Sequence, residues 1–267
     1  GDIIGSVYEF NPTKRKDFTP LFAAGSGFTD DTVLTVAVAD ALLHDAADVA
    51  ACLKRWGRRY PHCGWGGMFS RWLASDDMGA YGSFGNGAAM RVSAAAFLAD
   101  SLEEAWELSD RVTRVTHDHP EGMKGARATV TAIYLAFEGM PPEAVRGFIE
   151  EQFGYDLLRS VDEIRPGYRF DESCQRTVPE AITCALEAAD FEDAIRNAIS
   201  LGGDADTLAA IAGPIAEARF GIPEEILLAA WERLPDEMRP ILRALYRRRR
   251  RPDEEGVDRM QALLDEM

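Results

Sequence analysis

Two short acidic segments contain the residues whose types and spacing could do chemistry. The first is Phe28-Thr29-Asp30-Asp31-Thr32, and the second is Gly202-Gly203-Asp204-Ala205-Asp206-Thr207; each precedes a helical pattern. A helix N-terminus favours negative charge, and two glycines permit a tight turn before it. Facing one another, the two clusters would offer the oxygen ligands that Mg²⁺ and Mn²⁺ prefer. A single cluster of this kind would be assigned to helix capping, the commoner use of Asp and Thr.

A glycine-rich stretch could bind an anion. Residues 79–87 read Gly-Ala-Tyr-Gly-Ser-Phe-Gly-Asn-Gly and precede a predicted helix at 88–98. Backbone N–H groups at such a junction can cradle phosphate. The stretch lacks the Gly-Lys-Ser/Thr ending of a Walker loop, so taken alone it is interpreted as a connector. His117 and His119 follow later, but they lack the further ligands of a zinc site.

The elements that must position these segments are predicted to be helices. Apolar residues recur at helical spacing, and no convincing alternation typical of strands occurs. A small-residue helix at 1–9 would offer Glu9 in its last turn, whereas 10–27 and 154–177 are predicted loops. The other predicted helices cover 29–43, 46–60, 68–74, 88–98, 101–116, 121–137, 142–153, 178–188, 191–200, 208–219, 224–233, 235–250 and 257–267. The fold class is therefore all-α, in one compact multi-helix domain over 1–267.

Composition limits the function. The net charge of −16 argues against a nucleic-acid or anionic-membrane binder, because phosphate would be repelled at long range. The five arginines at 247–251 are interpreted as helix-end cations that complement the dipole. No apolar stretch approaches the roughly 20 residues that span a membrane. The four cysteines form no Cys-x-x-Cys pair, which favours reduced thiols in a cytoplasmic protein. We expect a monomer, with a few native residues before Gly1 because the sequence begins without Met.

Five motifs, in this order, resemble the ADP-ribosylglycohydrolase family, which includes the dinitrogenase-reductase-activating glycohydrolase and the ADP-ribosyl-acceptor hydrolases. They are Gly1-Asp2-x-x-Gly5-Ser6-x-x-Glu9, Phe28-Thr29-Asp30-Asp31-Thr32, Gly85-Asn86-Gly87-x-x-Met90-Arg91, Thr116-His117 and Gly202-Gly203-Asp204-x-Asp206-Thr207. Each motif is weak alone, but the ordered set covers nearly the whole chain. The resemblance implies an all-α fold with a binuclear site for two Mg²⁺, or Mn²⁺ in some members. It also implies cleavage of the bond between C1″ of the distal ribose and an acceptor.

The resemblance also implies roles for individual residues. The implied metal ligands are Thr29, Asp30, Asp31, Asp204, Asp206 and Thr207. The implied substrate-binding residues are Gly82, Ser83, Phe84, Gly85, Asn86, Gly87, Met90 and His117, with the diphosphate on the N–H groups of 82–86. Glycoside cleavage passes through an oxocarbenium-like state and needs a carboxylate to move a proton. Glu9, Asp31 and Asp206 are the candidates for that role, and the sequence does not rank them.

These assignments predict a divalent-metal-dependent hydrolase that removes ADP-ribose from a protein or a small conjugate. Two alternatives remain: a non-catalytic ADP-ribose-binding module and a metal-dependent phosphohydrolase. An arginine acceptor is slightly favoured, because loop carboxylates could hold a cationic guanidinium. Serine, a small molecule and a nucleic-acid end stay open as acceptors. The candidate acceptor-side carboxylates are Asp76, Asp77, Asp118, Glu121, Asp156 and Asp171.

Overall fold

Helices form the framework of the computed structural model, which describes residues 1–248. Those residues contain no strand and one isolated antiparallel bridge, between Gly85 and Ser173, so the all-α prediction is confirmed. The elements are α1 (Asp2–Gly5), α2 (Asp30–Leu43), α3 (Val49–Arg59), α4 (Gly67–Ala74), the 3₁₀ turn η1 (Asn86–Ala88), α5 (Ser93–Leu98), α6 (Leu102–Thr113), α7 (Pro120–Phe137), α8 (Pro142–Phe153), α9 (Val161–Ile164), α10 (Cys174–Leu186), α11 (Phe191–Ser200), α12 (Ala205–Phe220), α13 (Glu224–Trp231) and α14 (Arg239–Arg248). The helix predicted at 257–267 and most of the arginine run lie outside the described residues.

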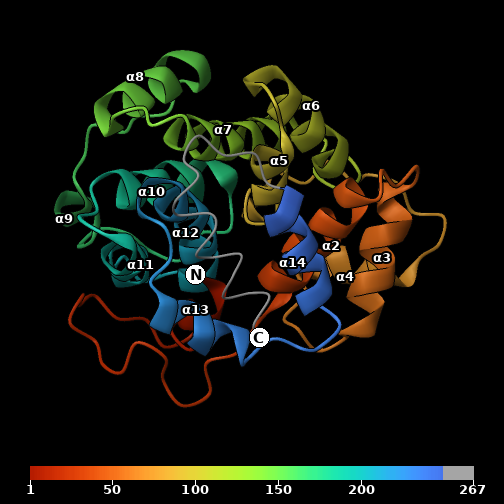
Figure 1. The fold of residues 1–267 in the computed structure, drawn as a ribbon, viewed down its shortest axis with the longest axis horizontal. Helices are drawn as coiled ribbons and strands as arrows, with labels where there is room; N and C mark the ends of the chain where they lie inside the picture. The colour runs from red at the N-terminus through yellow and green to blue at the C-terminus, as the bar shows by residue number, and fades with distance from the viewer. Residues whose placement is uncertain (249–267) are drawn as a thin grey trace.

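The helix α12 runs through the middle of the molecule (Figure 1). It packs against α10, α11, α7, α1 and α2, and thereby joins the first and last thirds of the described sequence. Its side chains are buried around most of its circumference, including Leu208, Ile211 and Ile215. A helix that is apolar on nearly all sides belongs in a core. The start of α12 carries the second acidic segment, so the protein core holds that segment in place.

Two glycines allow the close backbone approaches around this helix start. A Cβ on Gly5 would lie 2.5 Å from the Cα of Asp206, so α1 can rest directly on α12 only without a side chain there. Gly203 has a φ of +137°, which L-residues with side chains rarely adopt. A Cβ at Gly203 would also lie 2.9 Å from the ring of Tyr168. Both contacts bring the N-terminal segment and the 160–170 region against the second acidic segment.

The predicted helix over 1–9 is wrong in its length. The helix α1 ends at Gly5, where the Ser6 hydroxyl donates back to the carbonyl of Ile3 at 3.1 Å. This local bond competes with continuation of the helix. Glu9 therefore lies in a bend beyond the helix, not in its last turn.

The predicted helix over 88–98 is also wrong, because it is divided. The turn η1 is followed by a short irregular stretch, and α5 begins only at Ser93. The carbonyl of Met90 accepts a hydrogen bond from Thr35 Oγ1 at 3.3 Å, which ties this stretch to α2. The glycine-rich segment therefore runs into a 3₁₀ turn and not into the N-terminus of a long helix.

The predicted 154–177 loop contains helical structure. A capping box at Ser160 and Glu163 starts the one-turn helix α9, since each side chain bonds the backbone N–H of the other residue. The helix α10 begins at Cys174, four residues earlier than expected, and contains Pro179. The connection is therefore two short links around α9 instead of one long loop.

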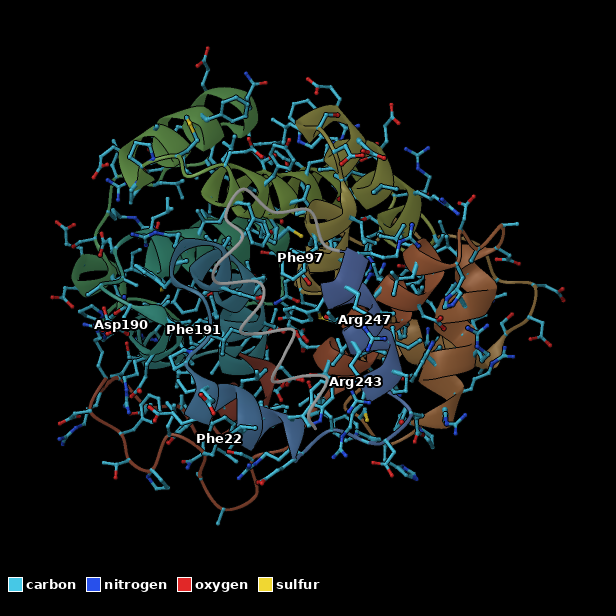
Figure 2. The ribbon with its side chains drawn as sticks, viewed as in Figure 1. Phe22, Phe97, Asp190, Phe191, Arg243 and Arg247 are labelled. Atoms are coloured by element: carbon cyan, nitrogen blue, oxygen red, sulfur yellow. The ribbon has the colours of Figure 1, made fainter. Side chains whose placement is uncertain are left out.

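An apolar cavity of about 230 Å³ lies beside α1, and Phe22, Phe97 and Phe191 are among its lining side chains (Figure 2). Its other lining residues are mainly aliphatic. Asp2 and Asp31 also border this cavity. Residues of the glycine-rich stretch and His117 line a different cavity, which Asp31 also borders and which is described below. No helix within residues 1–248 is both long and apolar enough to cross a membrane. All four cysteines are free thiols.

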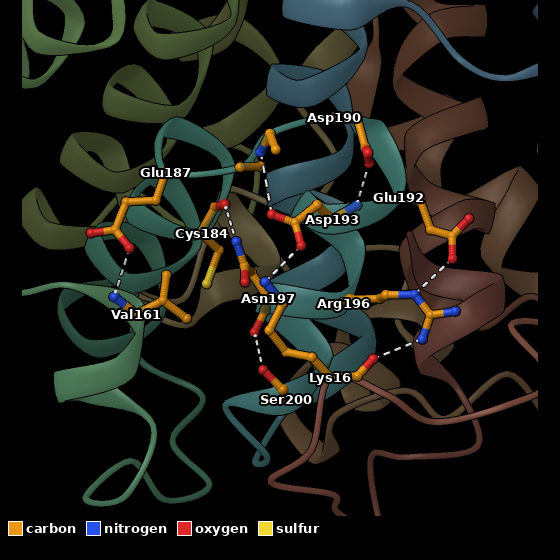
Figure 3. A network of polar contacts seen from close by, with 12 residues as sticks. Lys16, Val161, Cys184, Glu187, Asp190, Glu192, Asp193, Arg196, Asn197 and Ser200 are labelled. Atoms are coloured by element: carbon orange, nitrogen blue, oxygen red, sulfur yellow. Dashed lines mark hydrogen bonds and ion pairs between the residues drawn. The ribbon is translucent and has the colours of Figure 1, made fainter.

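The segment that follows Glu9 is attached to α11 by polar contacts (Figure 3). Arg196 donates to the carbonyls of Lys16 and Phe18, each at 2.7 Å. Lys16 Nζ in turn lies 2.6 Å from a carboxylate oxygen of Asp193. The segment 10–27 has no helix of its own, so these contacts hold it, and with it Glu9, against the helical core.

Candidate metal centre and ligand pocket

Carboxylates from three distant parts of the sequence meet at the start of α12. Asp2 belongs to α1, Asp31 to the first turn of α2 and Asp206 to the first turn of α12. One oxygen of each lies within 4.8 Å of an oxygen of the other two. Glu9, Asp204 and Asp206 form a second group by the same measure, so Asp206 belongs to both. The two acidic segments therefore face one another, as the sequence predicted.

Helix capping explains only part of these segments. Thr29 caps α2, since its hydroxyl accepts a hydrogen bond from the N–H of Asp31 at 3.3 Å. Asp204 has the equivalent N-cap position on α12 but makes no capping hydrogen bond with its side chain. Its carboxylate accepts instead from Asn86 Nδ2, at 2.6 Å. The carboxylate of Asp204 thus contacts the glycine-rich segment.

Burial and mutual repulsion raise the pKa values of these carboxyl groups. Burial, followed by the charges of Asp204 and Glu9, raises the pKa of Asp206 to about 9. Burial and then the charge of Asp2 raise the pKa of Asp30 to about 8, and burial followed by Asp204 raises that of Glu9 to about 7. These carboxyl groups have no lysine or arginine ion-pair partner among residues 1–248.

Two carboxylate oxygens here, Asp31 Oδ1 and Asp206 Oδ1, are buried from solvent and have no hydrogen-bond partner among the residues that the structure describes. A buried charge is strongly unfavourable unless it is paired or bound to a metal. Thr207 Oγ1 adds a hydroxyl oxygen 3.3 Å from Asp31 Oδ2. Hard divalent cations take oxygen ligands of this kind and would remove the repulsion. The donor set thus fits a metal centre of one or two such ions.

The other two implied ligands lie at the edge of the carboxylate groups. Asp30 lines the adjacent cavity but belongs to neither group. Thr29 Oγ1 is engaged with Asp2 Oδ1 at 2.9 Å. The ligand roles of these two residues remain predictions.

Asp2 is a site residue that the sequence analysis did not assign. Its Oδ2 accepts from the N–H groups of Thr29 at 2.9 Å and Thr32 at 3.1 Å, and also from the Thr32 hydroxyl. Asp2 therefore fixes the first turn of α2 while it borders Asp31 and Asp206. A signal was available, because Asp2 is the one acidic residue of the small-residue segment 1–6.

A cavity of about 240 Å³ opens beside the carboxylates. Six of the eight predicted substrate-binding residues line it: Ser83, Gly85, Asn86, Gly87, Met90 and His117. Gly82 and Phe84 line a neighbouring pocket together with Asp171. The structure thus brings the glycine-rich loop and the acidic segments to one cavity, although they are far apart in sequence.

Internal hydrogen bonds already use several N–H groups of the glycine-rich loop. Gly82 N–H donates to Asp118 at 2.7 Å, and Asn86 N–H donates to the carbonyl of Glu172 at 2.6 Å. Gly85 N–H donates to the Ser83 hydroxyl at 3.2 Å. These N–H groups are not free in this structure to form the phosphate cradle that the resemblance implies. The loop is instead held in shape by its own contacts, and its diphosphate role stays a prediction.

Arg91 and His117 form a basic part of the same cavity lining. Arg91 is fully buried, and burial lowers the pKa of its guanidinium to about 10. Burial, and then the nearby charge of Arg91, hold the pKa of His117 well below its usual value, so the imidazole is neutral. His117 was a predicted site residue, whereas Arg91 was quoted in a motif without a role.

None of the six candidate acceptor-side carboxylates lines this cavity, and Asp171 borders only the neighbouring pocket. Five of them have other partners. Asp76 pairs with Arg58 and Glu121 with Lys124, whereas Asp118, Asp156 and Asp171 accept from the N–H groups of Gly82, Leu158 and Ser173. Glu172, which sequence reasoning missed, lines the cavity together with Glu9. Its position next to Asp171 in the predicted loop was the only available signal.

Comparisons with known proteins agree with this geometry. The family model described as ADP-ribosylglycohydrolase matches residues 1–255. An ADP-ribosylarginine hydrolase Tri1 from Pseudomonas putida is 29% identical over 86% of this chain and 71% of its own length. The ADP-ribosylhydrolase ARH3 of Mus musculus is 27% identical, covering 84% of this chain and 82% of that protein. A solved structure titled ADP-ribosylglycohydrolase-related protein complex superimposes with a TM-score of 0.64 at 27% identity, over 93% of both chains. The chain belongs to the ADP-ribosylglycohydrolase family.

Proposed function

We propose that this chain is a divalent-metal-dependent hydrolase that cleaves the bond between C1″ of the distal ribose of ADP-ribose and an acceptor. The observation that carries the proposal is the pair of carboxylate groups that share Asp206 and have no lysine or arginine ion-pair partner in the described part of the chain. Both relatives reported above have names that state ADP-ribosyl hydrolysis. Two Mg²⁺ ions, or Mn²⁺ in their place, are the proposed cofactors.

The proposed metal ligands include Asp31, Asp204 and Asp206. Asp2, which the sequence analysis did not assign, is a further candidate ligand. Cations held there would supply Lewis acidity toward the ribose hydroxyls and a bound water. Glu9 is the least buried of the three catalytic candidates, and its pKa of about 7 suits proton transfer near neutral pH. We therefore assign the acid–base role to Glu9 and leave Asp31 and Asp206 as ligands. The positive charge of an oxocarbenium-like state would be stabilised by these surrounding carboxylates.

Arginine is the proposed acceptor. Glu172 and Glu9 line the cavity together, and the charge of Glu172 contributes to the raised pKa of Glu9. Two such carboxylates could hold a guanidinium by charge-assisted hydrogen bonds. The arginine-directed name of the Pseudomonas putida relative supports the same choice, whereas the ARH3 name leaves the acceptor open. The free cysteines fit a reducing, cytoplasmic setting.

The test is release of ADP-ribose from ADP-ribosyl-arginine, ADP-ribosyl-serine and O-acetyl-ADP-ribose in Mg²⁺, Mn²⁺ or EDTA. We expect metal-dependent turnover that EDTA abolishes. Phosphate release in place of ADP-ribose would instead identify a phosphohydrolase. Calorimetric ADP-ribose binding without turnover of any substrate would identify a binding module, and either result would overturn the proposal.

A further inference from the structure

Arg91 is a fully buried cation without an anionic partner in the described chain. Its Nη2 donates to Thr116 Oγ1 at 2.7 Å and to the carbonyl of Val112 at 3.4 Å. Its Nε and Nη1 are sealed from solvent and have no hydrogen-bond partner. Burying a charge in this way is costly unless something compensates for it. Because Arg91 lines the cavity, its unpaired charge favours an anion there.

The hydrogen bonds around Thr116 determine which group donates and which accepts at each contact. A guanidinium can only donate, so the Thr116 hydroxyl must accept from Arg91. The hydroxyl oxygen also lies 2.8 Å from His117 Nδ1. Thr116 is fully buried, and no other acceptor for its hydroxyl proton exists within the described residues. The hydroxyl therefore donates to Nδ1.

Arg91 opposes the other tautomer directly. Its Nη2 lies 3.4 Å from His117 Nδ1, so a proton on Nδ1 would face a second donor. With Nδ1 as the acceptor, the proton of the neutral imidazole lies on Nε2. No protein acceptor for Nε2 is present in the described part of the chain, so this donor is available to a ligand.

The position of Nε2 shows where such a ligand would lie. Cβ atoms added to Gly87 and Gly85 would lie 3.2 Å and 3.8 Å from Nε2, so both glycines leave space beside it. Gly85, Gly87 and His117 all line the same cavity. The Nε2–H therefore faces the glycine-rich loop across an open part of the cavity.

We propose that Arg91 and Thr116 are positioning residues that hold His117 as the Nε2–H tautomer, which donates to a phosphate oxygen of the ligand. The proposal rests on the proposed function, because ADP-ribose supplies the phosphates. The cavity then has two chemically distinct parts. Carboxylates take the cations, and a neutral donor with a buried guanidinium behind it takes the anion.

The tautomer can be observed directly by NMR of protein labelled with ¹⁵N-histidine. A His117→Gln variant assigns the signal among the four histidines. We expect His117 in the metal-free wild type to show a protonated Nε2 and an unprotonated Nδ1 between pH 6 and pH 8. An Nδ1–H signal, or a histidine that becomes charged in that range, would overturn the proposal. This experiment needs no substrate, so its outcome is independent of whether the protein hydrolyses anything.

Variants of Thr116 test whether its hydroxyl positions His117. Thr116→Val removes the hydroxyl at nearly constant shape, and we expect mixed His117 tautomers with about fivefold weaker ADP-ribose binding by calorimetry. Thr116→Ser should restore both properties. Thr113→Val is the matched control, because Thr113 Oγ1 is buried in the last residue of α6, three residues before Thr116, and has no hydrogen-bond partner within residues 1–248. We expect this control to keep the wild-type tautomer and affinity.

Binding of ligands with and without phosphate tests whether His117 contacts a phosphate group. The loss in Thr116→Val should appear with ADP-ribose and with ADP but not with adenosine, which carries no phosphate. An equal loss for adenosine would contradict the phosphate assignment. Unchanged tautomer and affinity in a folded Thr116→Val protein would contradict the positioning role. If this variant does not fold, the wild-type tautomer and the Thr116→Ser protein decide the question.

Discussion

The helix α2 carries two buried aspartates with opposite environments. Asp40 accepts hydrogen bonds from Trp56 Nε1 at 2.7 Å and Arg55 at 2.8 Å. Burial alone would raise its pKa, but these donors outweigh burial and the pKa falls below its usual value. Asp31, nine residues earlier, is surrounded by other carboxylates, and burial with their charges raises its pKa well above the usual value. The same residue type on the same helix is thus satisfied at one end and unsatisfied at the other.

This difference in partners distinguishes a structural carboxylate, Asp40, from a candidate ligand-binding carboxylate, Asp31. The fold supplies every partner that Asp40 needs, so removing its charge should weaken the protein. Around Asp31 and Asp206 the fold supplies repulsion and two unpaired oxygens, so removing a charge there should not weaken the metal-free protein. Perturbed carboxyl groups of this kind gather at functional sites. The comparison therefore makes opposite predictions for stability and for metal binding.

The largest expected effect is on metal binding. Asp206→Asn should abolish detectable Mg²⁺ or Mn²⁺ binding by calorimetry and reduce ADP-ribose release at least about 100-fold, because Asp206 belongs to both carboxylate groups. Above about pH 9, where Asp206 is ionised, its metal-free unfolding temperature should equal or exceed that of the wild type, since one repulsive charge is gone.

Asp40→Asn is the matched control for that variant. It should keep metal binding but lose roughly 1–2 kcal/mol of stability, because charge-assisted hydrogen bonds are lost. Full activity of Asp206→Asn at limiting Mg²⁺ would show that the metal assignment is wrong. A destabilised Asp206→Asn with a neutral Asp40→Asn would reverse the comparison itself.

A second effect concerns pH. The folded-state pKa values of Glu9, Asp30 and Asp206 are raised to about 7, 8 and 9, so the folded protein binds more protons than the unfolded chain above about pH 4. Stability of the metal-free protein should therefore fall as pH rises from about 5 to 9, by on the order of 5 °C in unfolding temperature. Asp40 acts in the opposite direction, because its stabilising charge is lost only when pH falls through its lowered pKa.

Saturating Mg²⁺ should flatten this decline, since metal binding displaces the protons. Scanning calorimetry across that pH range, with Mg²⁺ or EDTA, measures both curves. A metal-free protein whose stability rises steadily from pH 5 to pH 9 would contradict the raised pKa values. Metal that stabilises equally at pH 5 and pH 9 would contradict binding at these carboxylates.

The sequence predicted the all-α fold because helical periodicity and helix starts are local signals. Asp48, Ser101 and Asp190 cap α3, α6 and α11 with their own side chains, which a sequence pattern can show. The division of the 88–98 segment depends on a bond from Thr35, more than fifty residues away, and no local pattern contains it. Tertiary contacts of that kind override propensity.

The same distinction applies to the site. The acidic segments were found because each concentrates its charge within a few residues. Asp2 was missed because its importance comes from bonds to Thr29 and Thr32 across a helix boundary. Glu172 was missed because only the fold brings it next to Glu9. Residues whose role depends on long-range juxtaposition thus carried no sufficient signal of their own.

The smallest expected effect is on the choice between arginine and serine acceptors. It involves a third kind of carboxylate, one that is exposed and paired on the surface. Asp76, once a candidate for the acceptor side, is exposed and paired with Arg58 at 2.7 Å on the surface. Exposed pairs contribute little and are screened by salt. Asp76→Asn should therefore leave the ratio of ADP-ribosyl-arginine to ADP-ribosyl-serine turnover unchanged.

Glu172 differs because it lines the cavity and has no ion-pair partner among residues 1–248. A guanidinium there would gain a charge-assisted hydrogen bond that a serine hydroxyl cannot match. Glu172→Gln should lower the arginine-to-serine ratio by about fivefold while serine turnover stays constant. Side-by-side rates in saturating Mg²⁺ measure the ratio, with Asp76→Asn as the control. Equal losses for both acceptors would give Glu172 a general role, and an unchanged ratio would leave arginine preference without support from this carboxylate.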